Sequence, residues 1–148
     1  MQEWKIVIVD KDQAVLELLK TIFEEKGYKV TTVSSSQEAV QVIESLMPHL
    51  IILEIDLPGM DGYEICKKIK ADSKTRLIPV MFLTEKREME DKIKGLRLGA
   101  IDYLTKPFQR EELLARVHNV LHTCGALIQP PQKELKEEDV FSKLSSIS

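Results

Sequence analysis

Two kinds of hydrophobic pattern alternate along most of the chain. Short apolar runs rich in β-branched residues favour buried strands, and stretches with apolar residues every three or four positions favour amphipathic helices. The expected strands cover residues 4–9, 28–33, 49–55, 78–83 and 101–105. The expected helices run from an Asp12 cap to Gly27, from a Ser35 cap to Pro48, and over residues 63–70, 86–98 and 109–122. Five strands alternating with five helices predict an α/β fold, a doubly wound parallel sheet with helices on both faces.

Several side chains should fix the helix ends and the core. Asp12 is a natural N-cap, and Ser35 with Glu38 three residues later forms a capping box. Two apolar stripes are expected to face the core: Val15, Leu18, Leu19, Ile22 and Phe23 on the first helix, and Leu113, Leu114, Val117, Val120 and Leu121 on the last.

The amino-acid composition narrows the classes of function and the cellular location to be expected. The chain has 148 residues, 43% of them hydrophobic and 30% charged, with a formal net charge of -3. This balance gives no reason to expect binding to nucleic acid or membranes. The N-terminus does not resemble a signal peptide, and Cys66 and Cys124 lack metal or redox spacing. We therefore expect a cytoplasmic protein with reduced thiols, and partly buried packing for Cys66.

The chain is expected to contain one domain at residues 1–124, followed by a linker or C-terminal tail at 125–148. Gly125 and the adjacent Pro130 and Pro131 interrupt the last helix, and apolar residues return at helical spacing between Val140 and Ile147. The tail could be a short helix that packs on its own domain or on a partner. It could also be an unstructured tail, or the start of a linker to an output domain.

Polar side chains follow four of the expected strands. Asp10, Lys11, Glu54, Thr84 and Lys106 all lie at or just after a strand end. In open α/β sheets the functional crevice lies outside the carboxyl ends of the strands, so these five side chains should meet there.

Four segments occur in an order and spacing that resemble the receiver domain of two-component response regulators. They are IVIVDKD (6–12), LIILEIDLPGMDG (50–62), IPVMFLTE (78–85) and GAIDYLTKPF (99–108), and the resemblance covers residues 4–122. It implies a flavodoxin-like receiver fold with strand order 2-1-3-4-5, the order found in chemotaxis-type receivers of this family. It also implies transfer of a phosphoryl group from a histidine kinase to an aspartate after the third strand, with Mg²⁺ held by acidic residues after the first.

Matched residue by residue, the chain keeps part of this site. Asp10 fits the first acidic position, Thr84 and Lys106 fit the phosphate-binding positions, and Tyr103 fits the aromatic switch. Two positions depart from the family pattern: Lys11 replaces the second acidic residue, and Glu54 occupies the phosphoacceptor position.

These departures change the charge of the pocket. Two carboxylates and two ammonium groups cancel, which is unfavourable for a divalent cation. We expect Lys11 to stand in for the metal near Asp10 and Glu54, and a permanent ion pair between Glu54 and Lys106. The longer Glu54 side chain should reach beyond the position of an attacking aspartate.

The resulting prediction is a receiver in phosphorelay signalling that cannot be phosphorylated normally. It would have no enzymatic activity and no cofactor, although typical family members use Mg²⁺. It would act as a protein-interaction module for a histidine kinase or a downstream effector. The alternative is a functional phosphoacceptor that uses Glu54 or Asp56 with Mg²⁺. An enzyme that only shares the fold is a third possibility.

Other interpretations of the same residues stay open. Lys11 could be a solvated loop lysine, and Glu54 could reflect neutral drift or engineering. His118 and His122, one helical turn apart, could bind a metal but are more simply solvated side chains.

Any self-association is expected to use residues 86–122. This face carries Lys92, Asp102, Glu112 and Arg116, whose charges could pair across a twofold axis. Exposed ion pairs contribute at most about 1 kcal/mol each, so we expect a monomer or a weak dimer.

Overall fold

The sheet has the predicted topology. The computed structural model describes residues 3–123, in which five parallel strands lie in the order β2-β1-β3-β4-β5. The strands are β1 (Lys5–Val9), β2 (Lys29–Val33), β3 (Leu50–Leu53), β4 (Val80–Thr84) and β5 (Asp102–Thr105). All five carboxyl ends therefore lie at one edge of the sheet, as the prediction required.

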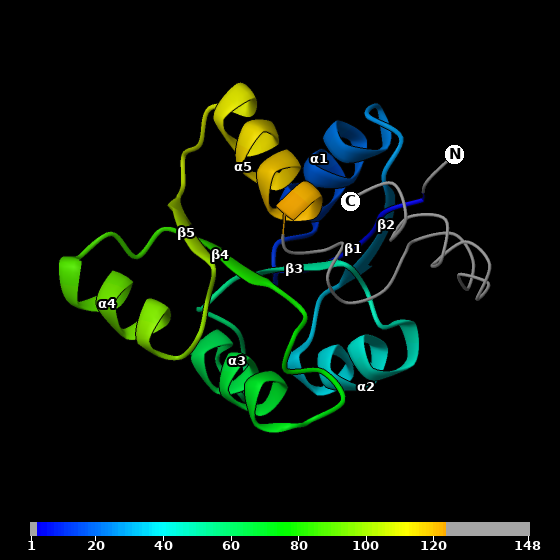
Figure 1. Ribbon diagram of the computed structural model, residues 1–148. Coiled ribbons are helices and arrows are strands. Elements are labelled where there is room, and N and C mark those ends of the chain that lie inside the picture. Colours follow the sequence, from blue (N-terminus) through cyan, green and yellow to red (C-terminus); the bar gives the residue numbers. More distant parts are fainter. Residues whose placement is uncertain (1–2, 124–148) are drawn as a thin grey trace, which may run out of the picture.

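Five helices cover the two faces of the sheet (Figure 1). They are α1 (Gln13–Glu24), α2 (Ser36–Leu46), α3 (Gly62–Ala71), α4 (Met89–Arg97) and α5 (Arg110–Thr123). α1 and α5 lie on one face, and α2 and α3 lie on the other, with α4 next to β5. This is the doubly wound arrangement predicted from the alternation of patterns.

Each face of the sheet has its own hydrophobic core. One core contains side chains of α2 and α3 against the sheet, and the other contains side chains of α1 and α5. In the α5 stripe Leu113, Val117, Val120 and Leu121 are buried, and Leu114 is partly buried. The central strands are covered on both sides, which explains their continuous apolar runs.

Two core predictions were wrong. Leu18 was expected to face the sheet but is 51% exposed, whereas Leu16 is buried. The helical register places residues 16, 19, 22 and 23 inward, and residue 18 then lies outside that stripe. Cys66 is fully rather than partly buried, and burial raises the pKa of its thiol to about 11.

The helix caps follow the predicted chemistry. The Asp12 carboxylate accepts a hydrogen bond from the backbone N–H of Ala14, at 2.9 Å. Ser35 Oγ accepts one from the N–H of Glu38, at 3.3 Å. α2 ends at Leu46, and the next residue, Met47, caps it with a φ of 48° in the left-handed region, immediately before Pro48.

Some predicted elements are too long. β3 ends at Leu53 rather than at residue 55, because the N–H groups of Ile55 and Asp56 donate to the Glu54 side chain. α4 begins at Met89 rather than at residue 86. No helix among residues 3–123 is long and apolar enough to cross a membrane. The predictions for Cys124 and for the tail at 125–148 lie outside the described residues.

Candidate functional site

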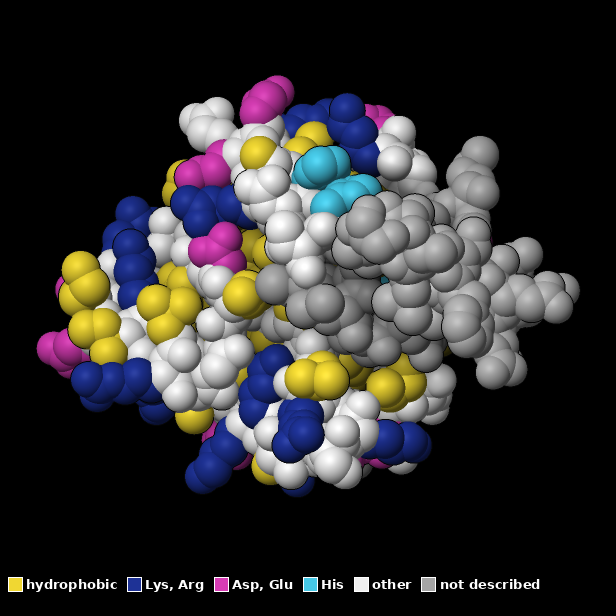
Figure 2. Space-filling model, viewed as in Figure 1, with side chains coloured by type: hydrophobic (Ala, Val, Ile, Leu, Met, Phe, Trp, Pro, Cys, Tyr) yellow, Lys and Arg dark blue, Asp and Glu magenta, His cyan; other side chains and the backbone are white. Residues whose placement is uncertain are grey.

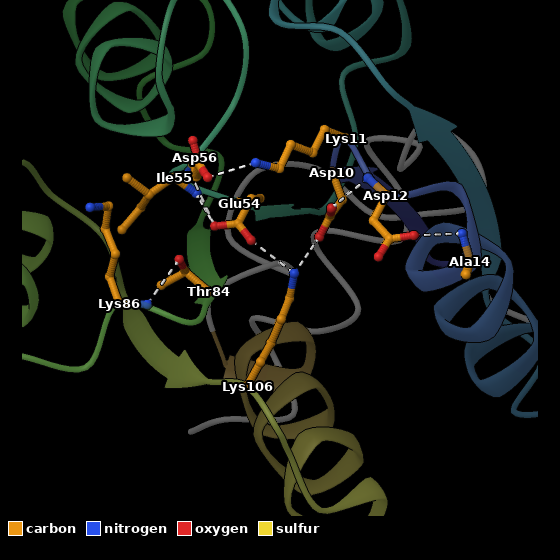
Figure 3. Close-up of polar contacts among 10 residues, drawn as sticks. All are labelled: Asp10, Lys11, Asp12, Ala14, Glu54, Ile55, Asp56, Thr84, Lys86 and Lys106. Carbon is orange, nitrogen blue, oxygen red and sulfur yellow. Dashed lines mark hydrogen bonds and ion pairs between the residues drawn. The ribbon is translucent and has the colours of Figure 1, made fainter.

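The five predicted strand-end residues meet in one cavity. Asp10 and Lys11 follow β1, Glu54 follows β3, Thr84 ends β4, and Lys106 follows β5. They line a cavity of about 350 Å³ at the carboxyl edge of the sheet, together with Asp12, Val15, Asp56, Glu85 and Lys86. Figure 3 shows that the side chains of Asp10, Glu54 and Lys106 point toward one another from three separate strands.

Lys106 bridges two buried carboxylates. Its Nζ lies 2.6 Å from Asp10 Oδ2 and 2.8 Å from Glu54 Oε1. The exposed fractions of the three side chains are 13% for Lys106, 4% for Asp10 and 6% for Glu54. Burial alone would lower the pKa of Lys106, but the hydrogen bonds to Asp10 and Glu54 outweigh burial and raise it. The ammonium is therefore charged at neutral pH, and the expected pair between Glu54 and Lys106 is present.

The remaining oxygens of both carboxylates accept backbone hydrogen bonds. Asp10 Oδ1 accepts from the N–H of Asp12 at 2.9 Å. Glu54 Oε2 accepts from the N–H groups of Ile55 at 2.7 Å and Asp56 at 3.2 Å. The Glu54 carboxylate turns back over the next two peptide groups, because those N–H donors and Lys106 stabilise the buried charge.

Lys11 was expected to stand in for the metal near Asp10 and Glu54, but it pairs with Asp56. Its Nζ lies 2.6 Å from Asp56 Oδ2, and both side chains are largely exposed, at 49% and 69%. This hydrogen bond raises the pKa of Lys11 and lowers that of Asp56. The ammonium between the two buried carboxylates belongs to Lys106 (Figure 3), which leaves no unpaired buried carboxylate for Lys11 to neutralise.

Thr84 and Tyr103 connect the cavity to the loop after β4. Thr84 is buried, and its Oγ1 accepts a long hydrogen bond of 3.4 Å from the N–H of Lys86. Tyr103 is buried as well, and its hydroxyl donates to the carbonyl of Lys86 at 2.7 Å. Burial, and then the neighbouring Tyr63, raise the pKa of Tyr103. Both side chains therefore contact the same residue of the β4–α4 loop.

The chemistry of the donor set does not suit Mg²⁺. The two buried carboxylates, Asp10 and Glu54, are neutralised by Lys106, and Lys11 adds a second cation at the cavity. Mg²⁺ prefers oxygen ligands in near-octahedral geometry, and a nearby ammonium repels it. Residues 3–123 contain no group of three or more His, Cys, Asp or Glu side chains that could hold a metal. His118 and His122 instead stack on each other, with ring centroids 4.2 Å apart.

Two residues near the site were not identified from the sequence. Arg87 Nη2 donates to the carbonyl of Lys106 at 2.7 Å, which links the β4–α4 loop to the residue that bridges the carboxylates. Tyr63 donates from its hydroxyl to the carbonyl of Asp91 at 3.0 Å. Neither contact has a sequence signal, because a surface arginine and an aromatic residue on a core stripe have simpler explanations.

Three of the four charged residues named for the 86–122 face are already paired within the chain. Arg116 Nη1 lies 2.8 Å from Asp102 Oδ1, and Nη2 lies 3.1 Å from Glu112 Oε2. All three residues are among those that were expected to pair across a twofold axis. An intermolecular pair would have to share or replace these contacts.

Comparison with known proteins establishes the family. The model of the family described as "Response regulator receiver domain" matches residues 6–118, and the chain belongs to this family. It is 39% identical over 140 residues to the alkaline phosphatase synthesis transcriptional regulatory protein PhoP of Bacillus subtilis, covering 95% of this chain and 57% of that protein. It is 41% identical to the phosphate regulon transcriptional regulatory protein PhoB of Pseudomonas aeruginosa, covering 81% of this chain and 52% of that protein.

A solved structure agrees with this assignment. A putative response regulator from Chloroflexus aurantiacus superimposes with a TM-score of 0.78 at 38% identity, covering 82% of this chain and 99% of that one. The chain spans about half the length of the curated relatives it matches. The protein is thus a receiver domain of the two-component signalling type, with the predicted fold.

Proposed function

We propose that this chain is a receiver that does not accept a phosphoryl group by the usual route and that acts as a protein-interaction module. It would have no catalytic activity of its own. Its partners would be signalling proteins, such as a histidine kinase or a downstream effector. The observation that carries this proposal is the state of Glu54: both of its carboxylate oxygens accept hydrogen bonds inside the protein.

A nucleophile in this position needs a free oxygen aimed at the incoming phosphorus. For Glu54 Oε1, attack would require separation from the Lys106 ammonium, and for Oε2 it would require loss of two N–H donors. A misplacement of about 1 Å can reduce a rate by roughly a hundredfold. The donor set of the cavity also does not suit Mg²⁺, and a metal ion would otherwise neutralise the charge that develops on the phosphoryl oxygens.

The test is treatment of the full chain with acetyl phosphate and Mg²⁺, followed by intact mass spectrometry. The native chain should gain no phosphoryl group. The double variant with Lys11→Asp and Glu54→Asp should gain one, because Thr84 and Lys106 are still present. The two single variants show whether Lys11 or Glu54 by itself prevents labelling. Lys11→Asp alone should remain unlabelled.

Asp56 is the competing acceptor, and the same assay addresses it. Its carboxylate is 69% exposed and is paired with Lys11, whereas Asp10 and Glu54 are buried and paired with Lys106. Labelling of the native chain that disappears in Glu54→Gln or in Asp56→Asn would overturn the proposal and identify the acceptor. Lack of labelling in the double variant would mean that the pocket differs from an active receiver at more than these two positions.

A further inference from the structure

Helix α4 is attached to the domain with little apolar burial. Among its nine residues only Gly95 is buried, and Glu88 provides no side-chain cap at its start. Met89, Ile93 and Leu96 are 68%, 40% and 49% exposed. Figure 2 shows hydrophobic side chains next to basic ones over this helix, at the left of the view. Since apolar burial stabilises most helices in proteins, another interaction must fix the position of α4.

Two buried tyrosine hydroxyls supply such an interaction. Tyr63, on α3, donates to the carbonyl of Asp91 at 3.0 Å, and Tyr103, on β5, donates to the carbonyl of Lys86 at 2.7 Å. Lys86 and Asp91 flank Met89, the first residue of α4. Hydroxyl donors from two different elements therefore hydrogen-bond to the backbone just before and just after the first residue of α4.

The rings of the same two tyrosines form the surface on which α4 rests. Phe82 lies between them, with ring centroids 5.6 Å from Tyr63 and 5.8 Å from Tyr103. A Cβ atom on Gly95 would lie 3.0 Å from the Phe82 ring and 3.1 Å from the Tyr103 ring. The α4 backbone thus contacts these rings directly, at the one residue where no side chain intervenes.

Tyr63 is also connected to the backbone of the phosphoacceptor position. The preceding residue, Gly62, donates its N–H to the carbonyl of Ile55 at 2.8 Å. A Cβ atom on Gly62 would lie only 2.2 Å from the carbonyl oxygen of Glu54. The start of α3 therefore packs tightly on residues 54 and 55, and the location of the Tyr63 ring depends on their backbone.

We propose that the Tyr63 hydroxyl acts beside that of Tyr103, the aromatic switch position, as a latch that fixes α4, and that Tyr63 connects residue 54 to α4 through the packing of Gly62 and the carbonyl of Asp91, rather than through Thr84. We define the tyrosine latch as these two hydroxyls and the carbonyls of Lys86 and Asp91. That the latch stays closed in signalling rests on the proposed function, because a chain that gains no phosphoryl group leaves residue 54 in one arrangement. The α4 surface would then be presented to partners in one position.

Hydrogen exchange of the full chain, without phosphodonor or Mg²⁺, tests the latch. Tyr63→Phe removes one hydroxyl and keeps the ring. Loss of one hydrogen bond should speed exchange in peptides covering residues 88–99 by roughly two- to tenfold relative to peptides of α5. Tyr28→Phe is the matched control, since Tyr28 packs against Phe23, a residue in the core on the other face. It should leave the ratio of α4 to α5 exchange unchanged.

Unchanged exchange of α4 in Tyr63→Phe would overturn the proposal, and so would an equal acceleration in α4 and α5. Tyr103→Phe should accelerate the same peptides, and exchange in the double variant should be faster than in either single variant. The outcome is independent of the phosphorylation assay. A chain that accepts phosphate but shows the predicted exchange would refute the proposed function alone, and an unlabelled chain with unchanged α4 exchange would refute the latch alone.

Discussion

Two lysine–carboxylate contacts lie on the same cavity and differ in almost every physical respect. Lys106 is 13% exposed and bridges two buried carboxylates, whereas Lys11 is 49% exposed and pairs with one carboxylate that is 69% exposed. The distances between nitrogen and oxygen are similar, so geometry alone would assign the two contacts equal contributions to stability. Burial separates them, because removal of one partner from a buried pair leaves an uncompensated charge, and water replaces the partner in an exposed pair.

The largest effect is expected from Lys106→Met, which leaves Asp10 and Glu54 close together without a cation. We expect a loss of about 3 kcal/mol in the free energy of unfolding, the lower end of the range for breaking a buried pair, because the cavity is open to water. Urea denaturation at pH 7 measures the loss. Combining Lys106→Met with Glu54→Gln should restore part of it, and no recovery in that double variant would contradict the role assigned to the buried charges.

The buried half of the site also depends on close backbone packing at Gly62. Gly62→Ala places a methyl group 2.2 Å from the Glu54 carbonyl oxygen, so the start of α3 must move. We expect a cost of about 2–3 kcal/mol, as for other overpacked positions. Gly27→Ala is the control: it has a left-handed φ of 85° but no atom within 4 Å, so it should cost only about 1 kcal/mol. If both variants lost the same free energy of unfolding, the close contact between Gly62→Ala and the Glu54 carbonyl would be relieved without cost.

His49 shows what burial does without a counter-charge. It lies before β3, at the end of the sheet opposite the cavity, and its Nδ1 accepts a hydrogen bond from the N–H of Lys5. Burial, and then the charge of Lys5, lower the pKa of His49. The unfolded chain then binds more protons than the folded one as the pH falls below about 6.5, so stability must decrease there.

This pH dependence can be measured as the difference in unfolding free energy between pH 7.5 and 5.5, two pH values on either side of the ordinary histidine pKa of about 6.5. His49→Asn removes the titrating ring, and the other two histidines cancel in the comparison. The native chain should lose more stability than the variant on acidification. An equal loss in both proteins would show that His49 is not held neutral by burial.

Lys11→Met should have the smallest effect. It is chemically the same change as Lys106→Met, but solvent screens the charges in the exposed pair and the free carboxylate of Asp56 is hydrated. Its urea midpoint should match that of the native chain within error. A loss comparable to that of Lys106→Met would mean that Lys11 stabilises the buried carboxylates, as the sequence suggested.

The sequence predicted the fold, the members of the site and the pair between Glu54 and Lys106, but not the partner of Lys11. Periodicity and caps were sufficient for the elements and for the convergence of Asp10, Glu54 and Lys106, and the family resemblance supplied the strand order. The assignment of Lys11 to the buried carboxylates was wrong, because spacing along the chain does not reveal that the Lys106 ammonium bridges both of them. Leu18 was misplaced for a related reason, since a five-residue stripe leaves the helical register open by one position. The role of Tyr63 depends on a hydroxyl and a carbonyl 28 residues apart, a relation that no local pattern contains.

The buried thiol of Cys66 provides a chemical probe of local opening between α3 and α4. Its Sγ lies 3.9 Å from the carbonyl oxygen of Leu98, the residue that follows α4. Only the thiolate reacts with alkylating reagents, and burial both covers this thiol and raises its pKa to about 11, which keeps it protonated in the folded protein. In a Cys124→Ser background, the rate at which an alkylating reagent modifies Cys66 would therefore report how often α3 and α4 separate.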